Sequence, residues 1–213
     1  SFGGARRVCR LLSEVGKIHL FFGESEKSDE AYIKALELAS EYNDDLAYAF
    51  TFVEYSNLLL EKEKYNEILD KLRKEVYPIF YHNNSERGLG YAKRIEAKCL
   101  LHTNEEHKSI EIFHESLEMF KDISLTVEVA KGHLDLSKAY LSIKENRLAL
   151  SSVREALRIA ESEGHNLLIK TIEDEFANIS EEEWTRIVDK RTKRERIQEE
   201  STSLLDALST LSQ

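Results

Sequence analysis

Apolar residues recur along most of the chain at the three- and four-residue spacing of amphipathic helices. The pattern breaks at Gly23 and resumes at Ala31, so the first forty residues read as two helices joined by a turn. Three later stretches of similar length repeat this arrangement. Pro78 stands at the end of one of them, and we expect it to end that helix.

The helix pairs keep a nearly constant register. A small residue in the middle of each first helix recurs at spacings of 40, 41 and 40 residues: Gly16, Ser56, Ala97 and Ser137. Sixteen residues after each lies a bulky side chain: Tyr32, Leu72, Phe113 and Val153. Three residues further on the side chain is small in three units, as at Ala35, Ser116 and Ala156, and Glu75 is the exception. A fixed period of this length is the signature of a repeat protein.

Small residues mark places where two helices cross closely, and the large residues between them fill the grooves. One helix pair cannot bury its own apolar face, so neighbouring pairs must stack. We therefore predict an all-α solenoid of four helix pairs in a right-handed superhelix without a sheet. A fifth first-type helix is expected over 166–177, followed by C-terminal capping helices. The predicted domains are residues 1–179 and 180–213.

The segments "VGKIHLFFGESEKSDEAYIKALELA" (15–39) and "LSKAYLSIKENRLALSSVREALRIA" (136–160) carry the strongest family signal. Each resembles a tetratricopeptide repeat (TPR), and the weaker resemblance of the other two units extends it over about residues 5–162. The period near 40 is similar to the longer repeats of large bacterial signalling ATPases, kinases and transcription activators. This resemblance implies a protein-binding module of a larger signalling or transcription regulator, and it implies no catalytic residues.

Composition narrows the classes of function. The net charge of −10 argues against general nucleic-acid binding, because phosphate contacts need a surplus of Lys and Arg. No apolar run approaches the roughly 20 residues that cross a bilayer. Two isolated cysteines, Cys9 and Cys99, fit a reducing cytoplasm, and we expect both to be small buried hydrophobes. The first residues, 1–4, lack an initiator Met and an apolar stretch, so we expect a piece of a longer protein; cleavage of a tag is the alternative explanation of this start.

Candidate chemistry is sparse. His102 and His107 form the only His-rich cluster, but they stand at an inter-helix turn without the spacing of metal ligands, so we expect surface residues there. The acidic runs lie at helix starts, where they stabilise the helix dipole. We expect no catalytic residue, no metal site and no cofactor.

The first helices of a TPR stack line a concave groove, and the family resemblance implies a protein or peptide ligand in that groove. The Lys/Asn/Asn/Lys/Arg clamp of chaperone-tail binders is absent, because those positions read Ser13, Lys17, Glu54, Tyr91 and Ile95. What remains is a basic cluster around Asn57. The candidate partner-binding residues are Lys17, Asn57, Tyr91, Arg94, Lys98, Lys131 and Lys138. Ordinary solubilising charges are the competing interpretation of these side chains.

The C-terminal segment has a different pattern. Ser180 and Glu183 form a capping box before a helix that carries Trp184. Basic residues between Arg186 and Arg196 are offset by acidic ones, which favours a solvated helix face over a nucleic-acid site. This segment either caps the last pair or pairs with a second copy as a homodimer. Self-association, or a spacer between sensor and output domains, is the alternative to the binding function.

Overall fold

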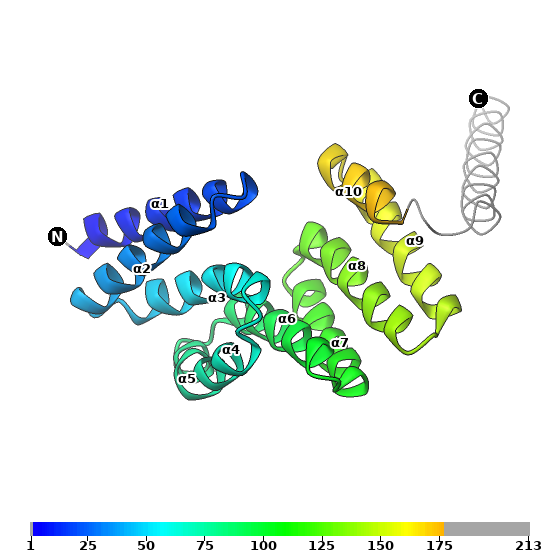
Figure 1. Ribbon diagram of the computed structural model, residues 1–213, viewed down its shortest axis with the longest axis horizontal. Helices are drawn as coiled ribbons and strands as arrows, with labels where there is room; N and C mark the ends of the chain where they lie inside the picture. Colours follow the sequence, from blue (N-terminus) through cyan, green and yellow to red (C-terminus); the bar gives the residue numbers. More distant parts are fainter. Residues whose placement is uncertain (1, 177–213) are drawn as a thin grey trace, which may run out of the picture. The chain divides into compact units, whose positions relative to one another are not determined.

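The computed structural model describes residues 2–176, and every regular element in this range is helical (Figure 1). The elements are α1 (Phe2–Phe21), α2 (Ser25–Glu41), α3 (Asp45–Glu61), α4 (Tyr65–Lys71), a π-helical turn η1 (Leu72–Val76), α5 (Tyr77–His82), α6 (Glu86–His102), α7 (Glu106–Asp122), α8 (Thr126–Ser142), α9 (Asn146–Ser162) and α10 (Asn166–Phe176). The prediction of an all-α fold is confirmed. The predicted capping box, Trp184 and the basic stretch 186–196 lie outside the described residues.

Each helix before α10 that is followed by a loop ends in the same kind of turn. The middle residue of every turn has a positive φ: Gly23, Asn43, Glu63, Asn84, Asn104, Ser124, Lys144 and Gly164. The following backbone N–H donates to the carbonyl five residues earlier, as from Asp44 to Ala39 at 2.9 Å and from Glu105 to Leu100 at 3.0 Å. This is the Schellman arrangement, which satisfies carbonyls that a helix end leaves open. Repeating one turn every 20 or 21 residues is what keeps the helix pairs in register.

The single spacing of 41 residues has a structural cause. α4, η1 and α5 run on without a break and contain 7, 5 and 6 residues, one more than the 17 of α2, α3 or α6. The Tyr77 N–H donates to the Leu72 carbonyl five residues back, so the extra residue is absorbed as a π turn. The insertion also explains the exception at Glu75. That residue is exposed, and Val76 is fully buried in the place that Ala35 fills in the first pair.

The prediction that Pro78 ends the second helix of its pair is wrong, because the helix continues to His82. Pro78 lies in the first turn of α5, immediately after the π turn. In a regular helix the proline ring would clash with the carbonyl four residues earlier and would remove one hydrogen bond. A widened turn at this point moves that carbonyl away and places the missing N–H where the hydrogen-bond register already changes.

The predicted alternation of small and large residues is confirmed in the core. A Cβ on Gly16 would lie 2.9 Å from the Tyr32 ring, so only glycine permits this contact between α1 and α2. The Ser28 hydroxyl donates to the Gly16 carbonyl at 2.8 Å, and in the third pair Ser109 donates to the Ala97 carbonyl at 2.7 Å. The bulky repeat positions are all buried: Tyr32, Leu72, Phe113 and Val153.

The chain divides into two compact units, residues 1–159 and 160–213. The first contains α1 to α8 and most of α9. Within the described residues the second contains the end of α9 and α10, whose buried side chains are Leu168, Ile172 and Phe176. A fifth first-type helix was predicted over 166–177, and α10 confirms it. The predicted domain boundary at 179/180 lies outside the described residues.

Candidate functional site

The first helices of the four pairs lie next to one another in the first unit. α1 packs against α3, α3 against α6, and α6 against α8. Because the register is constant, one position recurs on all four helices. We call this set the polar row; its members are Lys17, Asn57, Lys98 and Lys138. The position three residues before each is occupied by Glu14, Glu54, Ile95 and Asp135.

At the N-terminal end of the row, Lys17 bridges two carboxylates. Its Nζ lies 3.0 Å from Oε1 of Glu14 on the same helix and 3.1 Å from Oε1 of Glu54 on α3. Burial lowers the pKa of Lys17, but the two carboxylates outweigh it and the pKa is raised. Burial raises the pKa of Glu54 and outweighs the attraction of Lys17. Lys17 and Glu14 remain about half exposed, so this cluster contributes little stability.

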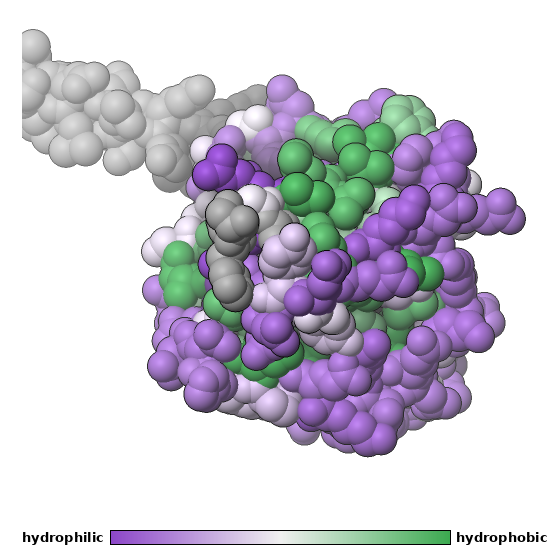
Figure 2. All heavy atoms as spheres, turned by 90° about the vertical axis from the view of Figure 1, so that its left-hand side faces the viewer, coloured by the Kyte–Doolittle hydropathy of each residue, from purple (hydrophilic) through white to green (hydrophobic). Residues whose placement is uncertain are grey.

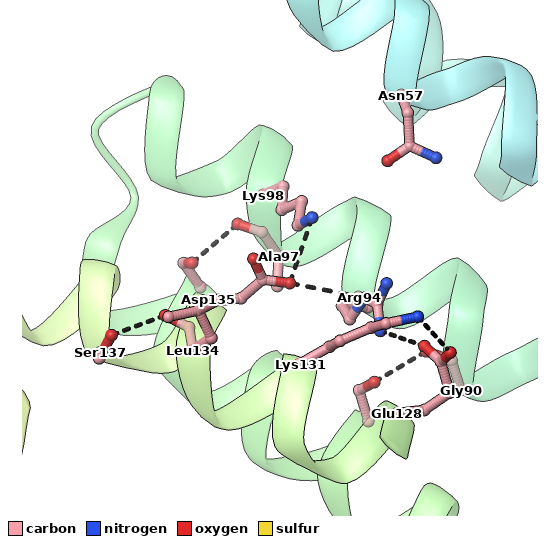
Figure 3. Close-up of polar contacts among 12 residues, drawn as sticks. Asn57, Gly90, Arg94, Ala97, Lys98, Glu128, Lys131, Leu134, Asp135 and Ser137 are labelled. Carbon is pink, nitrogen blue, oxygen red and sulfur yellow. Dashed lines mark hydrogen bonds and ion pairs between the residues drawn. The ribbon is translucent and has the colours of Figure 1, made fainter. Parts of the chain in front are cut away.

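The contact between α6 and α8 is more deeply embedded. We call the five residues that form it the central ion network: Arg94, Lys98, Glu128, Lys131 and Asp135. Arg94 Nη1 donates to Glu128 Oε2 at 2.6 Å, and its Nε lies 3.5 Å from Asp135 Oδ2 (Figure 3). Lys98 approaches the same Asp135 oxygen at 3.2 Å, and Lys131 approaches Glu128 Oε1 at 2.9 Å. The Arg94 and Glu128 side chains are each only 14% exposed.

The pKa values of Lys98 and Glu128 are both lowered, but for different reasons. Burial lowers the pKa of Lys98, although Asp135 acts to raise it. Burial acts to raise the pKa of Glu128, but the charges of Arg94 and Lys131 prevail and hold it below its ordinary value. Glu128 is therefore a carboxylate at neutral pH, held between two cations.

The ion pairs follow the repeat. Lys17 pairs with the carboxylate of the next first helix, Glu54, and Lys98 pairs in the same way with Asp135. Between α3 and α6 the equivalent positions hold Asn57 and Ile95, so the pairing is interrupted there. Asn57 is exposed, its amide donates to the Glu54 carbonyl of its own helix at 3.1 Å, and Figure 3 shows it pointing toward the helix that carries Lys98.

Tyr91 is half-buried beside this interruption. Its ring meets Phe120 edge-on with centroids 5.0 Å apart. The guanidinium groups of Arg87 and Arg94 lie 5.5 and 5.9 Å from the ring centroid. An aromatic ring between two guanidinium groups is held by cation–π attraction as well as by packing.

The structure brings three of the predicted site residues, Arg94, Lys98 and Lys131, into one cluster. Lys17 lies on α1 with its own carboxylates, whereas Asn57 and Lys138 are exposed on α3 and α8. Sequence reasoning missed Glu128, which holds two of the cations. An available signal was the seven-residue spacing of Glu128 and Asp135, which places both on one face of α8.

The other candidates for chemistry are structural. Cys9 and Cys99 are buried as predicted, and burial raises the pKa of Cys99 to about 12. His102 is exposed and stacks on Tyr65 with centroids 4.9 Å apart, and His107 is exposed in the first turn of α7. Across residues 2–176 no group of three His, Cys, Asp or Glu side chains has the arrangement of a metal site.

None of the helices described has both the length and the apolar character needed to cross a bilayer.

Comparison with known proteins gives a result for the fold only. No family model matches the sequence, and no curated protein matches it. Among solved structures the chain is similar to BtubC (BKLC) from P. vanneervenii, with 18% identity and a TM-score of 0.61. The match covers 94% of this chain and 88% of BtubC. This likeness shows a shared helical fold.

Proposed function

We propose that this chain is a TPR-like module that binds a protein or peptide on the surface formed by α1, α3, α6 and α8, and that it binds without catalysis. The main support is the interruption of the ion-pair row between α3 and α6. A side-chain amide both donates and accepts hydrogen bonds, which suits it to the main chain of an extended peptide. Asn57 presents such an amide on α3, pointing toward the helix that carries Lys98 (Figure 3).

The carboxylates of the central ion network support binding over catalysis. Glu128 and Asp135 are held by cations. Carboxylates held in this way fix neighbouring helices in place. General acid–base work instead needs a carboxyl group whose pKa lies near neutrality.

The resemblance of residues 15–39 and 136–160 to long TPR units supports a place within a larger signalling or transcription regulator. A spacer between sensor and output domains is the competing role. The two roles differ in one measurable respect, because a spacer has no ligand for the polar row.

A displayed library of random peptides, selected on the full chain, tests the proposal. Selected peptides are synthesised with a fluorophore, and their dissociation constants are measured by anisotropy for the wild type and for Asn57→Glu. Asn57 is exposed, so the variant should keep its fold and lose at least about tenfold in affinity, which corresponds to about 1.4 kcal/mol.

Lys34→Glu is the matched control, because Lys34 is exposed on α2 and changes the net charge in the same direction. It should leave the affinity unchanged. Failure to select any peptide, or equal weakening by both substitutions, would exclude a binding site centred on Asn57.

A further inference from the structure

α1 and the turn that follows it expose a line of large apolar side chains. We call this line the α1 stripe; its members are Val8, Leu11, Val15, Ile18 and Phe22. Their exposed fractions are 45%, 62%, 41%, 55% and 71%. The view from the side of the N-terminus shows hydrophobic surface gathered among hydrophilic surface (Figure 2). Contiguous apolar patches of about 300–600 Å² or more mark interaction sites on soluble proteins.

The same positions are covered in the later first helices. In α6 the buried residues are Leu89, Ala92, Glu96 and Cys99, and in α8 they are Val129, Gly132, Leu136 and Ala139. The helices of the preceding pair cover them. A Cβ on Gly132 would lie 2.7 Å from Leu117 of α7, and Glu96 binds Tyr77 and Arg73 of the second pair.

The α1 stripe differs in residue size from the equivalent positions of the later first helices. At the position of Leu11 the later first helices have smaller residues, Thr51, Ala92 and Gly132, whereas at the position of Ile18 they have Leu58, Cys99 and Ala139. A small side chain is needed at the first of these positions because the preceding pair approaches closely. The larger Leu11 would hold such a pair away, so the stripe does not fit another helix pair of this repeat.

The spacing of the α1 stripe fits a single partner helix. Within α1 its steps of three, four and three residues are those of a coiled-coil seam, in which each side chain inserts between four on the facing helix. Val8 and Val15 occupy one seam position, and Leu11 and Ile18 occupy the other. β-branched residues at the first position with Leu at the second are the pattern of two-stranded parallel coiled coils, which Val8, Leu11 and Val15 match and Ile18 does not.

We propose that the α1 stripe packs against the α1 stripe of a second copy of the chain, in parallel register. In that register Arg7 lies opposite Leu12 of the other copy and Glu14 lies opposite His19, so no like charges meet. An antiparallel arrangement would bring the two Glu14 carboxylates together. The seam joins one short helix from each copy, so we expect a weak dimer that forms at micromolar or higher concentration.

Sedimentation velocity of the full chain over micromolar to submillimolar concentrations tests this proposal. The wild type should show a concentration-dependent monomer–dimer equilibrium. The double variant Leu11→Lys/Ile18→Lys should weaken dimerisation at least about 100-fold, because charged groups would be buried in the seam. Its helical circular dichroism should be unchanged, since both positions are exposed in the monomer.

Ile33→Lys is the control, because Ile33 is also an exposed apolar residue (42%) but lies on α2 outside the stripe. It should dimerise like the wild type. A second readout is oxidation of Val15→Cys, which should give a covalent dimer because Val15 faces its own copy in the parallel register. The native thiols Cys9 and Cys99 are buried and should not compete.

A chain that stays monomeric throughout the concentration range would overturn the proposal, as would a dimer that the double variant leaves intact. A dimer without a Val15→Cys cross-link would overturn the parallel register.

Discussion

α1 and α6 hold the same position in their helix pairs, but they have different surroundings. α6 lies between α3 and α8, whereas α1 has a first-helix neighbour only in α3 within the described residues. The stripe positions of α6 are buried and include two small residues, Ala92 and Cys99, whereas those of α1 are large, with Leu11 62% exposed. A helix with neighbours on both sides therefore carries small side chains at contact positions, and these let the helix backbones approach closely.

The charged residues of the two helices differ in the same way. Arg94 of α6 is 14% exposed and joins two carboxylates of α8, whereas Lys17 of α1 is 43% exposed beside Glu54. The same cation–carboxylate contact is therefore structural in the interior of the repeat array and weak at its edge. Substitutions at equivalent positions of the two helices measure this difference directly.

The largest difference is expected for Ala92→Leu against Leu11→Ala. Leu and Ala have similar helix propensities, so packing decides the outcome. Ala92 is fully buried in the core of the second pair, and three added carbons should destabilise the fold by about 3 kcal/mol. Leu11→Ala should stay within about 0.5 kcal/mol in urea unfolding at a concentration where the chain is monomeric.

Equal losses of stability from Ala92→Leu and Leu11→Ala would show that the α1 stripe is covered in the isolated chain. That result would contradict the exposure described above.

The repeat period made much of this contrast predictable. The 40–41–40 register placed Gly16, Ala97 and Ser137 at equivalent buried positions, because close helix crossing leaves small residues at fixed intervals. The π turn was not predicted, although the extra residue was present in the spacing of 41. Pro78 was instead interpreted by its usual effect on a regular helix.

The candidate site was less predictable, because its contacts join residues far apart in sequence. Arg94 and Glu128 are 34 residues apart, and no local pattern links them. The basic side chains could be placed on the first helices from the register. Their carboxylate partners required knowing which helices are neighbours and which faces meet.

The second prediction compares Arg94→Met with Lys17→Met. Removing Arg94 leaves Glu128 and Asp135 largely buried with only lysines as partners, and should cost about 2 kcal/mol. Removing the half-exposed Lys17 should cost about 0.5 kcal/mol. Urea unfolding at neutral pH measures both. A loss for Lys17→Met as large as that for Arg94→Met would contradict a difference between edge and interior.

The third prediction concerns the turns that end the two helices. Gly23 follows α1 with a φ of 71°, and Asn104 follows α6 with a φ of 61°. Nothing lies within 4 Å of a Cβ built on Gly23, so Gly23→Ala should cost about 1 kcal/mol through backbone strain alone. Asn104→Gly should stabilise the protein, because glycine adopts a positive φ without steric cost. The gain should be only a few tenths of a kcal/mol, because asparagine tolerates this conformation better than most residues.

Thermal unfolding of the two turn variants checks these signs. If both substitutions stabilised the protein, or if neither did, the two turns would not share the same preference for glycine at the residue with positive φ.

The last prediction uses proton binding to separate the edge of the array from its interior. Glu54, beside Lys17, has a pKa raised above 4.5 by burial, so its contribution to stability is fully present below 4.5 and is lost as pH rises through the folded-state pKa. For Glu128 burial acts in the same direction, but Arg94 and Lys131 prevail and the pKa lies below 4.5. Its contribution is present above pH 4.5 and is lost as pH falls through the folded-state pKa.

Carboxyl-carbon NMR titration should therefore find that Glu54 becomes protonated first on acidification and Glu128 later. Arg94→Met should raise the midpoint of Glu128 and leave that of Glu54 unchanged, because Arg94 acts only on the interior cluster. A shift of both midpoints would mean that the two clusters share one electrostatic environment, and the distinction between edge and interior would then fail.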